Sequence, residues 1–382
     1  MESAHKAIEK NMTSKADGGA HLFHFEPKKF QDPLLSWYEQ NKSRHPWRMT
    51  WDQERDPYPV WLSEIMLQQT TLAAMIPVYE RFLYRFPTVY HLANAKEDDL
   101  KKTVQGLGYY RRFSLLHKGA QHLLSSKTAE IAWPRSYEEW LEIPGVGDYT
   151  AAALASITLN EAVPVIDGNV IRILCRIFDI RKSANDPSLK KELKALGYPL
   201  VSSSRPGDFN QGLMELGQKL CRPLRPNCVD CPLGSLCLAK KNESVHLAPA
   251  PKLKKEPKEV HLRLHIFEKK NAYALFERLS TSKFLRGTSG FLTEIGEGRD
   301  FKIDGLKESE RIGKGSYLGM IKHTITHHKI RGEVFLCSES SPLPGSMKLR
   351  WVKKSEVGSQ LVSSLDIKAW HLLQKETLGR LL

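Results

Sequence analysis

The chain has 382 residues, long enough for two domains, and its 41% hydrophobic and 26% charged residues are typical of a soluble globular protein. Lys and Arg outnumber Asp and Glu by 57 to 43, and the resulting net charge of +14 favours a polyanionic partner, most often nucleic acid, over a basic surface that serves solubility alone. No stretch approaches the roughly 18 consecutive apolar residues of a membrane helix.

Residues 1–27 are predicted to form a disordered tail. Their first part, MESAHKAIEKNMTSKADGGA, has no apolar core, so it does not resemble a secretory signal peptide. From about Phe30 to Lys240, apolar residues recur every three to four positions, which predicts helices. We expect Pro77 to begin a new helix, because a proline inside a helix removes a backbone donor. The stretch LKKTVQGLGYYRRFSLLHKGAQHLLSS predicts two helices joined at Gly106–Gly108.

The stretch IPGVGDYTA, Ile143–Ala151, predicts a tight turn between two helices, within about residues 136–157. Gly145 and Gly147 allow the turn, and the N–H groups that begin the next helix can bind an anion such as a DNA phosphate. The pattern resembles the helix–hairpin–helix motif of nonspecific DNA binders, and a plain helix–helix turn is the alternative. A further helix is predicted after Asp167–Gly168, with Asp167 as its N-cap.

Four of the six cysteines lie within seventeen residues, at the spacing C-x6-C-x2-C-x5-C. They are Cys221, Cys228, Cys231 and Cys237. In a chain without a secretory signal, such a cluster indicates a metal site, either zinc or a [4Fe–4S] cluster. The single compact, proline-rich loop favours the iron–sulfur cluster, although the spacing alone leaves zinc open. Cys175 and Cys337 lie in apolar runs and are predicted to be core residues.

A Pro- and Lys-rich linker is predicted at residues 244–258, where the composition changes. The runs VHLRLHIFEK, AYALFERL, GEVFLCSE and KLRWVKKSE then alternate apolar and polar residues and predict strands. The last twenty residues predict a helix. The predicted fold class is therefore a mainly α domain over residues 28–243, followed by a smaller α/β domain over residues 259–382.

The order of these features resembles the endonuclease III superfamily of DNA glycosylases. Within it, VWLSEIMLQQT, QGLGYYRR, VPVIDGNVIRIL and FNQGLMELGQKLC closely resemble the adenine-specific mismatch glycosylases of the MutY type, over about Pro33 to Leu238. The resemblance implies a monofunctional glycosylase of base excision repair that removes adenine mispaired with 8-oxoguanine or guanine. It further implies a [4Fe–4S] cofactor, a duplex DNA partner and a monomer, located in the bacterial cytoplasm or the eukaryotic nucleus.

Cleavage of an N-glycosidic bond needs a proton on the leaving base and negative charge near the cationic sugar. Glu64 lies among apolar residues, where burial favours the protonated acid, and it matches the family's general acid. Asp167 matches the carboxylate that stabilises the oxocarbenium ion. The structural alternatives are a surface salt bridge for Glu64 and the N-cap alone for Asp167.

Tyr149 stands where the related lyases carry a Lys that forms a Schiff base with the sugar. A tyrosine cannot form that bond, so we expect an abasic site and no strand cleavage. In some relatives, a tyrosine at this position orients the two carboxylates. Packing against the hairpin is the alternative role.

The target base must leave the duplex before it is cut. Gln69 and Tyr109 match the family residues that wedge into the base stack beside the oxidised guanine. Four further residues match positions around the flipped adenine, namely Trp47, Arg48, Leu67 and Glu215. The stretch RMTWDQERDPY is longer than its counterpart in the family.

The C-terminal region resembles the Nudix-like domain with which MutY-type enzymes read 8-oxoguanine, but it has no Nudix box, so no pyrophosphatase activity is expected. Ile325-Thr326-His327 stands where the family often has Phe-Ser-His. The Thr326 hydroxyl can replace that of Ser, whereas Ile325 cannot stack as Phe does. We therefore expect Thr326 and His327 to contact the lesion with an altered preference for the opposite base.

Two other functions are compatible with parts of this pattern. An endonuclease III-like lyase acting on oxidised pyrimidines would need the missing hairpin Lys. A noncatalytic iron–sulfur DNA-binding protein would have no use for both Glu64 and Asp167.

Overall fold

The computed structural model describes residues 24–124, 131–251, 256–297, 300–306, 312, 315–325, 327–338, 341, 345 and 347–379. Most of the predicted tail and residues 252–255 of the predicted linker lie outside these ranges, as does Thr326. Two compact units share the chain. Unit 1 comprises Met1–Arg55, Pro134–Glu142 and Val146–Lys252, and unit 2 comprises Asp56–Trp133, Ile143–Gly145 and Leu253–Leu382.

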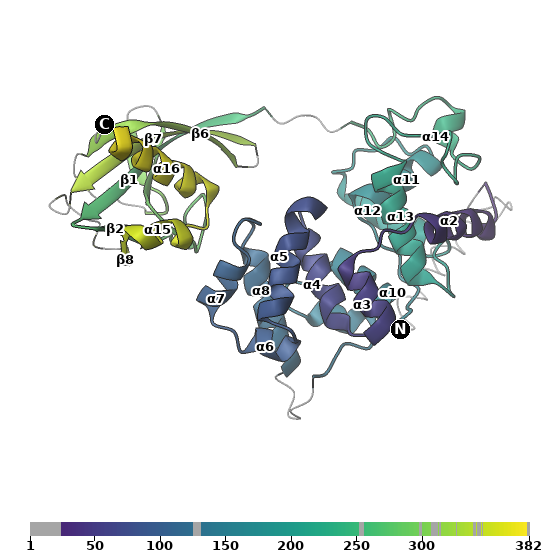
Figure 1. Ribbon diagram of the computed structural model, residues 1–382. Coiled ribbons are helices and arrows are strands. Elements are labelled where there is room, and N and C mark those ends of the chain that lie inside the picture. Colours follow the sequence, from purple (N-terminus) through teal and green to yellow (C-terminus); the bar gives the residue numbers. More distant parts are fainter. Residues whose placement is uncertain are drawn as a thin grey trace. The chain divides into compact units, whose positions relative to one another are not determined.

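Unit 1 is helical (Figure 1). Its helices are α2 (Pro27–Asn41), α3 (Pro46–Glu54), α9 (Tyr137–Glu142), α10 (Asp148–Thr158), α11 (Gly168–Ile177), α12 (Pro187–Gly197), α13 (Pro206–Lys219) and α14 (Leu238–Lys241). Helix α13 packs against α2, α10 and α11. Its Phe209 and Leu213 share a buried core with Phe30 of α2 and Leu174 of α11. Helix α13 is therefore the central element of this unit.

The helical part of unit 2 consists of α4 (Pro57–Leu67), α5 (Leu72–Arg85), α6 (Val89–Ala93), α7 (Glu97–Thr103) and α8 (Arg111–Leu124). The prediction that Pro77 begins a helix is wrong, because α5 continues through it. The carbonyl that loses its partner belongs to the exposed residue Ala73, where water can replace the missing bond. The predicted break between α7 and α8 is confirmed, with Gly106 and Gly108 at positive φ.

The remainder of unit 2 is a mixed sheet with helices (Figure 1). Its strands are β1 (Lys258–Lys269), β2 (Ala272–Glu277), β3 (Ser289–Gly290), β4 (Leu292–Glu297), β5 (Asp300–Ile303), β6 (Ser316–Ile325), β7 (His328–Ser338) and β8 (Leu349–Lys353). Strand β1 is central, parallel to β7 and antiparallel to β2 and β4. The path β3-β2-β1-β4-β5 is extended by β8 beside β2 and by β6 beside β7.

Alternation along β1 separates two apolar layers. Leu262 and Leu264 pack with Trp370 of α16 (Ser364–Gly379), which also contacts β6. Phe267 packs with Phe276 in a second buried cluster. A short helix, α15 (Lys354–Gln360), contacts β2 and β8. The predicted fold class, a mainly α part followed by a smaller α/β part, is confirmed, whereas the predicted domain limits stay predictions.

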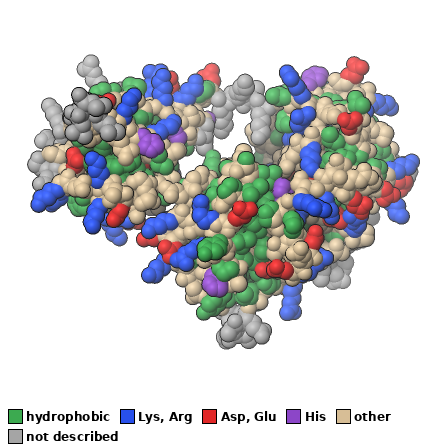
Figure 2. All heavy atoms as spheres, viewed as in Figure 1, with side chains coloured by type: hydrophobic (Ala, Val, Ile, Leu, Met, Phe, Trp, Pro, Cys, Tyr) green, Lys and Arg blue, Asp and Glu red, His purple; other side chains and the backbone are tan. Residues whose placement is uncertain are grey.

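The described residues include no helix whose length and apolar character would suit a membrane crossing. Lys and Arg side chains are spread over the visible faces of both units, with Asp and Glu between them (Figure 2). The net charge of +14 comes from the excess of these Lys and Arg residues over Asp and Glu.

Candidate active site

Glu64 lies on α4, an almost entirely buried helix of unit 2. Asp56 caps the helix by accepting a hydrogen bond from the Tyr58 N–H. The Glu64 side chain is 6% exposed, between the fully buried Ser63 and Ile65. The burial expected from the sequence is confirmed, and it removes the alternative of a salt bridge on the helix surface.

Asp167 caps α11 in unit 1, as predicted. Its Oδ1 accepts hydrogen bonds from the N–H groups of Asn169, at 2.9 Å, and Val170, at 2.7 Å. Asn169 Nδ2 donates to Oδ2 at 2.9 Å. Burial raises the pKa of Asp167 above its ordinary value, although the bonds from Val170 and Asn169 and the charge of Arg172 oppose the rise. The cap therefore holds a carboxylate in surroundings that disfavour its charge.

Helix α13 brings three predicted positions together in unit 1. The Tyr149 hydroxyl on α10 donates to Sδ of Met214 at 3.5 Å, and the next residue on α13 is Glu215. Two residues further on, Gly217 packs against Asn169, and a Cβ at Gly217 would lie 2.6 Å from Cβ of Asn169. The helix therefore contacts Tyr149 on one side and the residue that binds Asp167 on the other.

Arg48 and Glu215 form an ion pair between α3 and α13. Arg48 also donates to Oε1 of Gln211 at 2.6 Å and to the Ser43 carbonyl at 2.9 Å. Nζ of Lys219 lies 2.7 Å from Glu215, which is 3% exposed. Burial opposes the charge of Glu215, but Arg48 and Lys219 outweigh it and hold its pKa below the ordinary value.

Trp47 and Leu67 complete the set predicted around the flipped base. Trp47 is buried on α3 and stacks on His45, with ring centroids 4.5 Å apart and planes 16° apart. Leu67 is the last residue of α4 and is half-buried in unit 2. In unit 1, the structure thus places Trp47 next to the Arg48–Glu215 ion pair.

The two predicted wedge residues share an unusual backbone conformation in unit 2. Gln69 has φ of 58° and Tyr109 has φ of 48°, both in the left-handed region that residues other than glycine rarely adopt. Both are exposed, Tyr109 by 53%. Gln69 lies between α4 and α5, and Tyr109 lies between α7 and α8. Such strain persists only where neighbouring groups fix it, and it occurs preferentially at functional sites.

The hairpin glycines differ in what they require. Gly145 has φ of 88°, and a Cβ there would lie 2.7 Å from Cβ of Leu115. Gly147 has φ of −100° and is the exposed N-cap of α10, with open space around it. The predicted turn is confirmed, and the first N–H groups of α10 follow an N-cap without a side chain.

All four clustered cysteines line one cavity of unit 1. Nη1 of Arg176 lies 3.3 Å from Sγ of Cys221. Burial raises the pKa of two of the thiols, and backbone N–H groups act to lower it, that of Leu233 for Cys231 and those of Lys240 and Ala239 for Cys237. Among the described residues, no three His, Cys, Asp or Glu side chains already stand at metal-coordinating positions. The shared cavity and the Arg176 guanidinium beside Cys221 nevertheless fit a thiolate-bound group.

Burial raises the pKa of the Cys231 thiol to about 11 and that of Cys237 in the same direction. Neighbouring cysteines add to both shifts. Thiols crowded in this way ionise readily only when a cation shares their charge, as a bound metal does.

The predicted lesion loop joins β6 and β7. Ile325 pairs with His328 at the end of the ladder, and the rings of His327 and His328 lie 4.1 Å apart. Thr326 lies outside the described residues. On β6, Nε2 of His323 lies 3.4 Å from the Ser364 hydroxyl at the start of α16.

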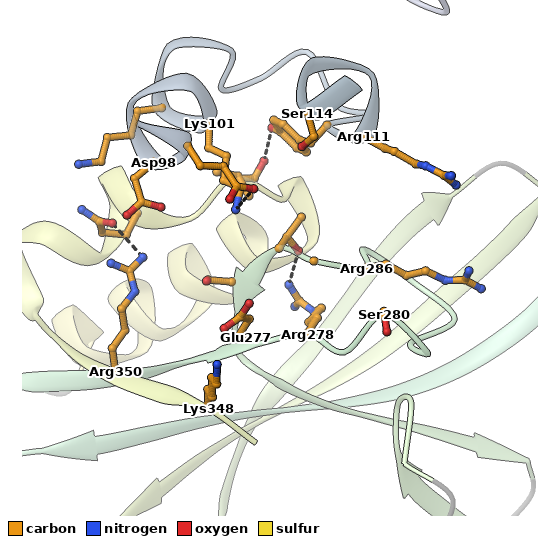
Figure 3. Close-up of a pocket in the computed structure, with 18 of the residues that line it drawn as sticks. Asp98, Lys101, Arg111, Ser114, Glu277, Arg278, Ser280, Arg286, Lys348 and Arg350 are labelled. Carbon is orange, nitrogen blue, oxygen red and sulfur yellow. Dashed lines mark hydrogen bonds and ion pairs between the residues drawn. The ribbon is translucent and has the colours of Figure 1, made fainter. Parts of the chain in front are cut away.

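A basic cavity of about 730 Å³ in unit 2 adjoins the Tyr109 loop. Figure 3 shows Arg111, from a helix on one wall, and Arg286, from a loop on the other, extending toward the same side. Lys101, Lys348 and Arg350 also line the cavity. The sequence did not single out this cluster, because its members lie far apart in the chain.

Comparisons with known proteins show which proteins the chain resembles. The family described as "HhH-GPD superfamily base excision DNA repair protein" matches residues 62–198. The adenine DNA glycosylase of Buchnera aphidicola subsp. Baizongia pistaciae (strain Bp) is 31% identical over 301 residues, which cover 78% of this chain and 83% of that protein. The adenine DNA glycosylase of Homo sapiens is 42% identical over 227 residues, covering 58% and 41%.

The chain spans about two fifths of the length of the first curated relatives it matches. Among solved structures, a thermostable thymine-DNA glycosylase is 26% identical with a TM-score of 0.49, covering 56% of this chain and 97% of that one.

Proposed function

The chain belongs to the adenine DNA glycosylase family of MutY type, and we propose that it is a monofunctional glycosylase that excises adenine mispaired with 8-oxoguanine or guanine from duplex DNA. The observation that carries the proposal is the similarity that spans 83% of an adenine DNA glycosylase, together with a buried glutamate at the position of the family's acid. Release of the base leaves an abasic site for later steps of base excision repair.

In the proposed reaction, Glu64 donates its proton to the adenine and Asp167 stabilises the positive charge that develops on the sugar. The buried position of Glu64 suits an acid that must reach the base protonated. Asp167 is held by three hydrogen bonds, so its carboxylate is oriented before the substrate binds. Tyr149 lacks an amine, so the reaction ends at hydrolysis without strand cleavage.

The flipped adenine is proposed to contact Trp47, Leu67 and the Arg48–Glu215 pair. Gln69 and Tyr109 are proposed to fill the space that the base leaves in the stack. Their exposed, fixed conformations suit residues that must enter a duplex without first being ordered. Thr326 and His327 are proposed to contact the oxidised guanine.

Duplex DNA is the proposed substrate and partner. The N–H groups after Gly147 can bind one phosphate, and the basic cavity of unit 2 offers arginines to the backbone beside the Tyr109 loop. These contacts are independent of sequence, as a repair enzyme that searches a genome requires. We propose that the protein acts as a monomer.

For the cysteine loop, we propose a [4Fe–4S] cluster held by Cys221, Cys228, Cys231 and Cys237. When bound, the cluster would supply a rigid cross-link of the loop rather than a step of the hydrolysis. The loop presents the exposed Arg222 and Arg225, which we propose contact phosphates. Zinc is the alternative occupant.

A single-turnover assay tests the function. Duplexes with adenine opposite 8-oxoguanine, guanine or thymine, and one with thymine glycol, are incubated with the protein and analysed with and without alkali. We expect loss of adenine opposite 8-oxoguanine and guanine, with strand breaks only after alkali. Cleavage at thymine glycol without alkali would instead identify a lyase. The Glu64→Gln variant should keep DNA affinity and lose excision, whereas a noncatalytic binding protein would lose nothing.

A further inference from the structure

Arg112 is a buried cation with no part in the reaction proposed above. It lies in the first turn of α8, three residues after Tyr109, and is 7% exposed. Among the described residues, no carboxylate lies within ion-pair distance of it, and its Nε is buried without a hydrogen-bond partner. A buried arginine needs compensation for the lost hydration, and here that compensation comes from peptide dipoles.

The guanidinium of Arg112 is directed at the end of α4. Nη1 donates to the carbonyls of Ile65, at 3.1 Å, Met66, at 2.8 Å, and Gln68. The last carbonyls of a helix lack partners within the helix and carry its negative dipole end. Arg112 therefore caps α4 through a side chain that comes from a distant helix.

The same guanidinium reaches both wedge loops. Nη2 donates to the Thr70 hydroxyl at 2.7 Å and to the Leu107 carbonyl at 3.4 Å. Its bonds to Gln68 and Thr70 thus lie on either side of Gln69. Its bond to Leu107, together with its own backbone bond to the Tyr109 carbonyl, holds the other loop.

We propose that Arg112 is the positioning residue of the wedge: it joins the α4–α5 and α7–α8 loops and fixes Gln69 and Tyr109 in the left-handed conformations with which they enter the base stack. The inference rests on the proposed function for the roles of Gln69 and Tyr109, but the joining of the two loops can be tested without DNA. A planar group with several fixed donors is needed, so lysine cannot replace it.

Hydrogen exchange of the free protein is the first test. In Arg112→Met and Arg112→Lys, the amides of residues 67–71 and 105–110 should exchange at least tenfold faster than in the wild type, since local opening becomes easier. The matched control is Arg85→Met, an exposed arginine of the same unit that pairs with Asp99. Unchanged exchange in both loops would overturn the joining role, whatever the enzyme does to DNA.

Excision is the second test. Arg112→Lys should lose on the order of a hundredfold in single-turnover excision of adenine from a duplex mispair, because wedge residues that are no longer held cannot offset the cost of unstacking the base. Excision of an adenine that is already unstacked, opposite a one-nucleotide gap, should fall by less than about threefold. Equal losses on both substrates would show that Arg112 serves general integrity and not the wedge.

A gentler variant guards against misfolding. Thr70→Val removes one acceptor of Arg112 and leaves the buried arginine itself unchanged. Like Arg112→Lys, it should slow excision from the duplex mispair more than excision of the unstacked adenine, but by a smaller factor. If the wild type excised no adenine from any duplex, the proposed function would fail, and the exchange measurement would still decide whether Arg112 joins the loops.

Discussion

At the scale of single residues, Asp167 combines two demands that normally conflict. As an N-cap it benefits from its charge, because backbone N–H groups donate to it. Its pKa is nevertheless raised, because burial disfavours that charge more strongly. A folded-state pKa above the unfolded value means that the ionised group destabilises the fold at neutral pH, and that this penalty disappears as the pH falls below both values.

Asp167→Asn is therefore expected to abolish excision while leaving the protein at least as stable as the wild type at pH 7. Asparagine caps a helix as well as aspartate and carries no charge to bury. Calorimetry at pH 7 and near pH 4 should show a higher Tm for the variant at pH 7 and a difference that shrinks in acid. A lower Tm at pH 7, or excision at the wild-type rate, would contradict the assignment.

Single residues also show what the sequence can reveal about a site. The apolar residues around Glu64 predicted its burial, whereas its role as the acid came only from the resemblance to the family. Cys175 and Cys337 are fully buried as expected. Arg112 was missed, because nothing local distinguishes it from its exposed neighbour Arg111. Its role depends on carbonyls more than forty residues away, and no periodicity or spacing carries that information.

At the scale of elements, the hairpin before α10 contains two glycines that serve different purposes: Gly145 is required by the backbone conformation, and Gly147 is proposed to serve DNA binding. Gly145 needs its positive φ and has no room for a Cβ beside Leu115. Gly147 needs neither a positive φ nor the missing Cβ, and as an N-cap without a side chain it leaves the first N–H groups of α10 accessible, which is the role we propose for it.

Gly145→Ala should lower the free energy of unfolding by about 1–3 kcal/mol, the usual cost of a strained left-handed residue. Gly147→Ala should change it by less than about 1 kcal/mol but weaken DNA binding, because a methyl group would stand where a phosphate approaches. Urea unfolding and DNA titration of both variants separate the two effects. Equal loss of stability in both would show that the hairpin serves only as a connection.

The cysteine loop is the second element with a clear expectation. Anaerobically purified protein should be brown, with iron and sulfide each near four per chain. A Cys231→Ser variant should lose most of this colour and iron and should unfold more readily around α14. Colourless protein that holds one zinc ion would reverse the assignment.

The elements that escaped the sequence analysis did so for identifiable reasons. Strands β3, β4, β5 and β6 were not predicted, although β1, β2, β7 and β8 were. Gly296 interrupts the alternation of β4 because the Phe301 ring occupies the space of a side chain, and a Cβ at Gly296 would lie 2.5 Å from that ring. Gly319, at φ of 149°, marks the bulge where β6 shifts its register against β7. These segments form strands because of how they pack against their neighbours, and their local composition does not show it.

At the scale of the whole molecule, the net charge of +14 predicts how DNA binding responds to salt. If about four phosphates are neutralised, affinity for an undamaged duplex should fall about a hundredfold between roughly 50 and 200 mM salt. The rate of excision from a fully bound duplex should stay nearly constant over this range. Affinity that changes by less than about threefold would show that the basic surface serves solubility instead.

The interleaving of the two units along the chain has a consequence for synthesis on the ribosome. Phe30 and Leu34 of α2 are buried against α13, which begins at Pro206. At about 5–20 residues per second, roughly ten to thirty seconds separate the emergence of these helices. During that interval α2 lacks α13, the helix against which its apolar face packs. The nascent chain therefore offers a hydrophobic segment to chaperones long before either unit can close.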